Sequence, residues 1–261
     1  MYRTGILGGT IPSSDDISLW RYMNFEKFED LIKTQCLYFA SLSQFDDKFE
    51  GSTPRLTHRP LEVLKRLRQT HASTRRLTGT SSIERIQYAR QITAALEVNS
   101  RRGMQSLLSE IYVNCWHANE YESDAMWKLY SDRGPSVAIQ TCFRKLRSEL
   151  TENVDLGEVK YIDYDSAVFG DGTFERFWHK RKSFEHEKEI RALIWKPKID
   201  GTMMHKGKGI VVKVDLARLI NAVRTNPFSN QDLANRVTEL TRNQGFEFEV
   251  QISKLSIEPI F

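Results

Sequence analysis

Two glutamates and an arginine at alternating positions are the most chemically suggestive group in this chain. Glu187, Glu189 and Arg191 alternate with other residues in the segment 183–195, and the positions after Glu189 that alternate with them are apolar. An extended strand over residues 187–195 would place all three charges on one face, because a strand points successive side chains to opposite sides. Carboxylates held in this way can orient a sugar hydroxyl, polarise a nucleophile or bind a metal ion. The alternative is a solvated strand face with an incidental glutamate–arginine pair.

The elements that must position these charges are predicted from hydrophobic periodicity and turn residues. Strands are expected near residues 19–23, 36–40, 111–116, 136–141, 157–164, 187–195, 209–214 and 246–253. Helices are expected near residues 25–33, 123–130, 143–150, 174–182, 216–223 and 231–244. This mixture favours a single α+β domain over residues 19–261, built on a mixed, split β-sheet with flanking helices. Residues 1–18 predict a loosely ordered lead-in.

A helical insertion is expected at about residues 59–110, and it is strongly basic. Between Arg59 and Arg102 there are ten Lys and Arg residues against three Glu residues, a net charge of +7 in a chain whose total is +4. A basic surface of this kind suits a phosphate-rich partner such as nucleic acid. The alternative is a solvated pair of helices with charged outer faces. The oligomeric state stays open.

Length and composition describe an ordinary globular chain. Of its 261 residues, 40% are hydrophobic and 28% are charged, which provides enough apolar material for a full core. No apolar run approaches the ~20 residues that cross a bilayer, and the N-terminus lacks a long apolar signal core. Cys36, Cys115 and Cys142 have no CxxC spacing and predict buried, reduced thiols. Together these features predict a cytoplasmic protein that does not enter a membrane.

Four segments, taken together, carry a family resemblance. They are Trp20–Tyr22, Tyr38–Gly51, Met126–Tyr130 and Glu187–Arg191. They resemble a large bacterial domain-of-unknown-function family, frequent near mobile elements, that opens with Leu-Tyr-x-Tyr and continues to an Asn-Asp-Pro-Phe-Glu-like turn. Met-Trp-x-x-Tyr and a Glu-x-Glu-x-Arg strand follow in that family. The likeness covers about residues 19–261, and departs from the pattern at positions 46–48, where Asp-Asp-Lys replaces Asn-Asp-Pro, and in the long insertion.

The order of polar residues also resembles that of ADP-ribosyltransferases. Those enzymes place an Arg or His on a first strand, aromatic or hydroxyl residues on a middle element, and a Glu on a later strand. The resemblance implies NAD as the cofactor, with Arg21 gripping the dinucleotide through its guanidinium. It further implies that Tyr38 and Ser41 line the nicotinamide end and that Arg191 contributes to cofactor binding.

The chemistry implied by this resemblance is cleavage of the C–N glycosidic bond of NAD. Glu189 would bond to the ribose 2′-hydroxyl and stabilise positive charge as the bond breaks, while Glu187 would activate the acceptor. The implied protein is an ADP-ribosyltransferase-like enzyme of a bacterial toxin or phage-defence setting, acting on nucleic acid or a nucleic-acid-associated protein. Such a site requires the side chains of Arg21, Tyr38 and Glu189 to converge on one cleft, and Arg21 is expected on the same face of the sheet as Glu187 and Glu189. The structural alternative is an Arg21 that only pairs with one of those glutamates.

Two other classes of function stay open at this point, and so does whether the chain is an enzyme at all. A metal-dependent nuclease could hold Mg²⁺ with Asp46, Asp47 and Glu50, or with the Glu187/Glu189 pair. However, Asp46 and Asp47 lie in a turn that ends in glycine, where aspartates usually cap backbone groups, so no metal ligand is predicted. The third class is a non-catalytic module that binds nucleic acid or protein, in which the charged strand is structural.

Overall fold

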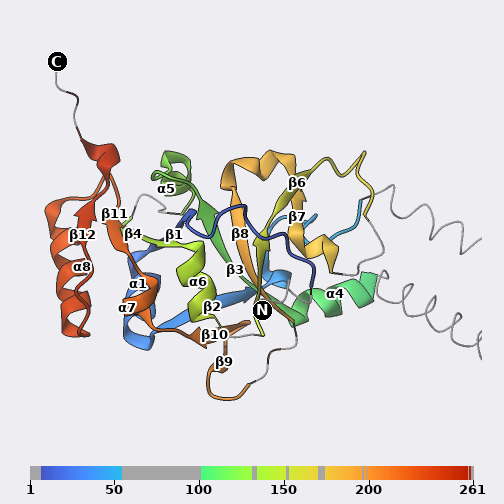
Figure 1. Ribbon diagram of the computed structural model, residues 1–261, viewed down its shortest axis with the longest axis horizontal. Helices are drawn as coiled ribbons and strands as arrows, with labels where there is room; N and C mark the ends of the chain where they lie inside the picture. Colours follow the sequence, from blue (N-terminus) through green and yellow to red (C-terminus); the bar gives the residue numbers. More distant parts are fainter. Residues whose placement is uncertain are drawn as a thin grey trace, which may run out of the picture.

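The computed structural model describes residues 7–54, 101–130, 134–150, 153–169, 174–195, 197, 199–257 and 259 (Figure 1). It confirms an α+β fold with a mixed, mostly antiparallel sheet and flanking helices. The predicted basic insertion lies outside the described residues except for its last part, which forms helix α4 (Arg101–Glu110). In the described ranges, no helix combines the length and the apolar character that a membrane span needs.

One large sheet organises the fold, and its main path runs β12–β11–β4–β1–β3–β2–β10–β9. Those strands are β1 (Ser18–Asn24), β2 (Cys36–Ser41), β3 (Ile111–Ala118), β4 (Ser136–Cys142), β9 (Met203–Lys206), β10 (Gly209–Lys213), β11 (Ala222–Thr225) and β12 (Val250–Ile252). Off this path, β8 (Glu189–Trp195) pairs with β3 and with β5 (Asp155–Glu158). A separate parallel pair joins β6 (Lys160–Ile162) to β7 (His179–Arg181).

The sheet is split alongside β3. One edge of β3 pairs with β8 along almost the whole strand. On the other edge the two ends of β3 pair with different strands: Val113 lies opposite Ala40 of β2, and His117 lies opposite Trp20 of β1. Strands β1 and β2 therefore diverge beside the middle of β3. This arrangement confirms the predicted split sheet.

Helix α1 (Phe25–Thr34) connects the two diverging strands. Asn24 caps its first turn, since the side-chain oxygen accepts a backbone N–H at 3.0 Å. The apolar stripe centred on Phe28 is buried against the sheet, and Gln35 ends the helix in a left-handed conformation with φ of 53°. The cap, the apolar stripe and the left-handed C-terminal residue all depend on residues close by in the sequence. This explains why α1 lies where the sequence predicts a helix.

Helices cover the two faces of the sheet differently. The main core lies on one face, under α1, α6 (Phe143–Glu149), α7 (Leu216–Leu219) and α8 (Gln231–Asn243) (Figure 1). The other face carries α5 (Asp124–Tyr130), whose Met126 and Trp127 pack against Trp20 and Tyr22 of β1. A further core on that side involves α4 and the short 3₁₀ helix η3 (Glu175–Trp178). Over the described part of the chain, the other 3₁₀ helices are η1 (Leu42–Gln44), η4 (Lys182–Glu187) and η5 (Lys254–Ser256).

Several segments differ from the sequence predictions. The helix expected near residues 174–182 is the single turn η3 followed by strand β7. The strand expected from Glu187 begins at Glu189, because η4 ends at Glu187 and Lys188 adopts a left-handed conformation with φ of 40°. The helix expected near residues 216–223 ends at Leu219, since the residues from Ala222 onward pair with β4 and β12. In the first and third cases pairing with distant strands outweighs local propensity.

The N-terminal segment is also more ordered than predicted, over its described residues 7–17. Leu7 is buried, and its carbonyl accepts a hydrogen bond of 2.8 Å from the Trp178 indole. Thr10 forms an isolated bridge with Glu158 at the edge of β5. The composition suggested a loose lead-in, but specific contacts with β5 and η3 hold this stretch.

Gly209 in β10 makes room for the Tyr38 ring, which predicts a measurable cost for any side chain there. A Cβ at Gly209 would lie 2.4 Å from the Phe39 carbonyl oxygen and 2.5 Å from the ring of Tyr38. We expect Gly209→Ala to lower the free energy of unfolding by about 1–3 kcal/mol in urea titrations, because both strand and ring must shift. Gly207→Ala is the control: its Cβ meets nothing within 4 Å, so it incurs only the strain of a φ of 58°, roughly 1 kcal/mol. Equal losses in the two variants would contradict this account.

Candidate functional site

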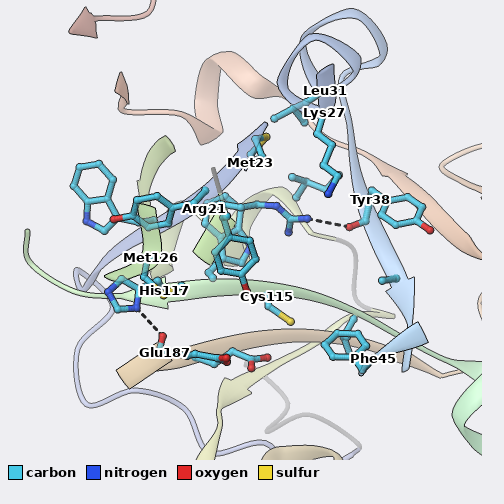
Figure 2. A pocket seen from close by; sticks show the side chains of 18 of the residues that line it. Arg21, Met23, Lys27, Leu31, Tyr38, Phe45, Cys115, His117, Met126 and Glu187 are labelled. Atoms are coloured by element: carbon cyan, nitrogen blue, oxygen red, sulfur yellow. Dashed lines mark hydrogen bonds between the residues drawn. The ribbon is translucent and has the colours of Figure 1, made fainter. Parts of the chain in front are cut away.

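A pocket of about 490 Å³ opens where the sheet is split (Figure 2). Its walls come from β1, α1, β2, the middle of β3, α5 and the segment from β7 to β8. Its charged lining residues are Arg21, Lys27, Asp30, Lys180, Glu187, Glu189 and Lys206. Aromatic rings, among them Trp116 and Tyr130, form much of the rest. The pocket therefore combines stacking surfaces with charges of both signs.

Arg21 and Glu189 reach this pocket from opposite faces of the sheet. Trp20 pairs with His117 and His117 pairs with Glu189, so these three side chains share one face. Arg21 is the next residue along β1 and starts from the other face. Its guanidinium enters the gap between β1 and β2, where Nη2 donates to the Tyr38 carbonyl at 3.3 Å. The expectation that Arg21 and the glutamates share a face is wrong, and they line one pocket because the sheet is split there.

The Arg21 guanidinium is an uncompensated buried charge. None of the ion pairs among the described residues includes it, which contradicts the alternative of a structural Arg21–glutamate pair. Its Nη1 is buried without a hydrogen-bond partner, and the guanidinium carbon lies 5.9 Å from the centre of the Trp116 ring. Burial lowers the pKa of Arg21. A desolvated guanidinium with an unused donor is suited to an anion.

A second cation lies close to this end of the pocket. Lys27, in the first turn of α1, lines the pocket with Arg21, and Figure 2 shows its side chain extending toward the Arg21 end. Two cations directed into one space repel one another in the empty pocket. An anionic ligand would relieve that repulsion.

A buried ion network lies at the carboxylate end, centred on Arg191. Its side chain is 0% exposed, and Nη1 contacts Glu50 at 2.6 Å while Nε contacts Glu189 at 2.7 Å. Nη1 also donates to the Phe177 carbonyl at 2.7 Å. Burial alone would lower the pKa of Arg191, but Glu189 and Glu50 raise it above its ordinary value. Arg191 does not line the pocket, so the predicted direct role in cofactor binding gives way to a role in fixing Glu189.

Glu189 is ionised, and one of its two carboxylate oxygens is already bound by Arg191. Burial by itself favours the neutral acid, yet Arg191 and Lys180 hold the pKa of Glu189 at about 2. Its Oε1 is bound by Arg191, Oε2 lies 3.4 Å from the Lys180 ammonium, and the Cys115 thiol also hydrogen-bonds to the carboxylate. The backbone N–H of Glu189 donates to the Tyr161 hydroxyl at 2.8 Å, which anchors the start of β8. Oε2 therefore has the longer ion-pair contact, which makes it the oxygen better suited to a ligand hydroxyl.

Glu187 lies beside Glu189 although it does not belong to the strand. It ends the 3₁₀ helix η4, and its Oε2 is 2.5 Å from the Lys180 ammonium. The ring Nδ1 of His117 hydrogen-bonds to the Glu187 carbonyl at 2.6 Å, as drawn in Figure 2. The two glutamates thus meet at the pocket through a tight turn, not through strand alternation.

Tyr38 and Ser41 do not present the groups that the resemblance implied. Tyr38 lines the pocket, and its carbonyl accepts from Arg21 and, at 2.8 Å, from the Asn114 side chain. Figure 2 shows its ring pointing away from Arg21, and the ring lies across Gly209. Ser41 is buried outside the pocket, where its hydroxyl donates to the Leu108 carbonyl at 3.1 Å. Tyr38 therefore contributes backbone, and Ser41 fastens β2 to α4.

The acidic turn after β2 is held by cations. Asp47 accepts the backbone N–H of Phe49 at 3.1 Å, which confirms a capping role, and pairs with Arg181 at 2.8 Å. Glu50 pairs with Arg191. Over the ranges that the structure describes, no group of three or more His, Cys, Asp or Glu residues is arranged to hold a metal ion. These carboxylates dock the turn onto β7 and β8.

Several pocket residues are not among the predicted site residues. Tyr130 could have been found, because it ends the Met126–Tyr130 segment on which the family resemblance rests; burial, with Cys115 and both glutamates, raises the pKa of its phenol. Burial and Glu189 raise the pKa of the Cys115 thiol well above its ordinary value, so it is a poor nucleophile. Lys27 and Lys180 carry no local signal, and only the fold brings them to the pocket.

The two arginines should respond in opposite directions to removal of their charge. Arg21→Met removes a desolvated charge with an unpaired donor, and the Tyr38 carbonyl keeps its bond from Asn114. We expect this variant to be more stable than the wild type, by ~1 kcal/mol. Arg191→Met leaves Glu50 and Glu189 buried without their cation, so we expect a loss of about 3–5 kcal/mol. Thermal unfolding measures both, and a destabilised Arg21→Met protein would refute the uncompensated-charge interpretation.

Glu189 should make stability depend on acid pH. Its folded-state pKa of about 2 lies below the ordinary 4.5, so its contribution is complete above pH 4.5 and is lost as pH falls toward 2. We expect Glu189→Gln to lose roughly 3 kcal/mol at neutral pH, and this deficit to shrink through that window. Urea unfolding at a series of pH values measures it. Glu29→Gln, which breaks only an exposed pair with Lys33, serves as the control with little effect at any pH. A pH-independent deficit would contradict the assignment.

Comparisons with known proteins provide no relative for this chain. No protein-family model matches it, and neither a curated protein nor a solved structure does so. The resemblances to the bacterial domain-of-unknown-function family and to ADP-ribosyltransferases therefore stay hypotheses that rest on residues of this chain. What the pocket does must be argued from its geometry and charges.

Proposed function

We propose that this pocket binds NAD and that the protein is an ADP-ribosyltransferase-like enzyme. The observation that carries the proposal is a single pocket with a guanidinium that has no ionic partner at one side and, at another, the ionised Glu189 beside Glu187. NAD presents matching groups, namely an anionic pyrophosphate and a ribose next to a positively charged nicotinamide. The pocket volume, about 490 Å³, falls within the ~300–1,000 Å³ of small-molecule sites.

The cation end would hold the pyrophosphate. Arg21 has a buried Nη1 with no partner, and a phosphate oxygen would supply the missing acceptor. Lys27 would add a second positive charge from α1. The Trp116 ring beside Arg21 offers an apolar surface for the ligand. This assignment keeps the dinucleotide role predicted for Arg21 and replaces the predicted partners Ser41 and Arg191 by Lys27.

The carboxylate end would act on the ribose. When bound, NAD supplies a C–N glycosidic bond whose cleavage releases neutral nicotinamide with the bonding electron pair and leaves the ribose to an acceptor nucleophile. Glu189, kept ionised and fixed through Oε1 by Arg191, would accept a ribose hydroxyl at Oε2 and favour the developing positive charge. Glu187 would take the proton that the acceptor loses, as general base. This arrangement supports the roles predicted for both glutamates.

The acceptor is the least constrained part of the proposal. The basic segment between Arg59 and Arg102, with its net charge of +7, favours nucleic acid or a protein bound to nucleic acid. That segment lies outside the described residues apart from the start of α4. The nuclease alternative is weaker, because Asp47 and Glu50 are already committed to Arg181 and Arg191.

Nicotinamide release and NAD binding should separate the roles of the two ends. We expect wild-type protein to bind NAD in calorimetry and to release nicotinamide, and Arg21→Met to weaken binding by at least ~10-fold, because it removes a charge-assisted contact. Glu187→Gln and Glu189→Gln should still bind NAD but should release nicotinamide at least ~100-fold more slowly, because each removes a charge that stabilises the transition state. All assays are run well below the melting temperature of the least stable variant.

Exposed Glu29→Gln is the matched control and should behave as wild type in both assays. The absence of any NAD binding by wild-type protein would refute the proposal. NAD binding without nicotinamide release would indicate that the protein is a dinucleotide-binding module and not an enzyme. Cleavage of DNA or RNA that depends on a divalent cation would favour the nuclease.

A further inference from the structure

Lys180 stands between the two carboxylates of the proposed active site. Its ammonium is 2.5 Å from Glu187 and 3.4 Å from Glu189, and its side chain is only 8% exposed. It lines the pocket, and its ammonium lies 5.0 Å from the centre of the Phe184 ring. A lysine that faces a ligand pocket from beneath two carboxylates is a costly arrangement unless those carboxylates need it.

We propose that Lys180 is a positioning residue, which keeps Glu189 ionised and holds Glu187 beside it for the ribose of the substrate. The proposal rests on the function assigned above and names a residue that neither the sequence pattern nor the resemblance singled out. Two adjacent carboxylates repel each other and tend to share a proton, as in any closely spaced acidic pair. An ammonium between them removes the reason to take up that proton.

The charges around Lys180 show that the nearby carboxylates have few other cations with which to pair. The titratable groups that face it from neighbouring elements are Glu187 on η4, Glu189 and Arg191 on β8, Cys115 on β3, Tyr130 on α5, Tyr161 on β6 and Glu50 in the turn after η1. Among these groups, three carboxylates face two cations, Lys180 and Arg191. Without Lys180, Arg191 would be the only cation among these groups for all three carboxylates, and it is already bonded to Glu50 and Glu189.

Lys180 cannot itself be the base or the nucleophile. Burial alone would lower the pKa of Lys180, but Glu189 and Glu187 raise it well above its ordinary value, so the amine stays protonated. Its uneven contacts also suit a positioning role. The short bond holds Glu187, while the long contact leaves Glu189 Oε2 open to a ligand hydroxyl.

The test compares Lys180→Met with Lys180→Arg, and uses exposed Lys182→Met as the matched control. Nicotinamide release is measured as kcat and KM for NAD across the acid pH range, and the glutamate side-chain carboxyl carbons are titrated by ¹³C NMR. In Lys180→Met we expect the acid limb of kcat to move up by at least about one pH unit, with KM nearly unchanged. The Glu189 carboxyl resonance should titrate at a higher pH than in wild type. Lys180→Arg and Lys182→Met should keep the wild-type values.

An unmoved acid limb and an unmoved Glu189 titration in Lys180→Met would overturn the proposal and leave Lys180 as a structural ion pair. If wild-type protein releases no nicotinamide, the proposed function fails, and the NMR titration alone still decides for or against Lys180. If Lys180→Met does not fold, Lys180→Gln, which keeps a hydrogen-bond donor without the charge, is titrated in its place against the same two outcomes.

Discussion

Arg191 is a fully buried cation, and distant parts of the chain converge on it, although its Nη2 has no hydrogen-bond partner. Its guanidinium bonds to Glu50 in the turn after η1, to Glu189 on its own strand and to the Phe177 carbonyl of η3. A buried guanidinium without such partners would be strongly destabilising, so the turn, β8 and η3 must assemble together. The same bonds hold Glu189 ionised and oriented beside the pocket. The position of Glu189 is therefore a consequence of burying this charge.

The contrast between the fully buried Arg191 and the half-buried Arg21 divides structure from function in this protein. Arg191 has carboxylate partners and no access to the pocket, whereas Arg21 lines the pocket and has no carboxylate partner among the described residues. A charge that the fold leaves uncompensated is destabilising in the absence of a ligand, and such charges concentrate at functional sites. The split in the sheet makes this possible, because it lets a side chain from the core face of β1 reach a pocket on the other face.

Part of the candidate site could be predicted from residue types and spacing. Residue types and spacing single out Glu187, Glu189 and Arg21, which line one pocket, yet the expectation that they share a face of the sheet is wrong. Alternation describes one strand at a time, while the relation of Arg21 to Glu189 depends on pairing across β1, β3 and β8. Lys180 could not be found, because a lysine in sequence has no mark that distinguishes a buried ion pair from a solvated side chain.

The sequence by itself determined the elements whose signals are local. The β1–α1–β2 unit follows from an apolar strand pattern, the Asn24 cap and the helical spacing around Phe28. Tertiary structure decided where some elements begin and end: β8 begins at Glu189, and β11 replaces the second half of a predicted helix. It also decided the docking of the acidic turn onto Arg191 and the opening beside β3. The physical reason is that caps and periodicity act within a few residues, whereas strand pairing and charge burial depend on partners that are distant in sequence.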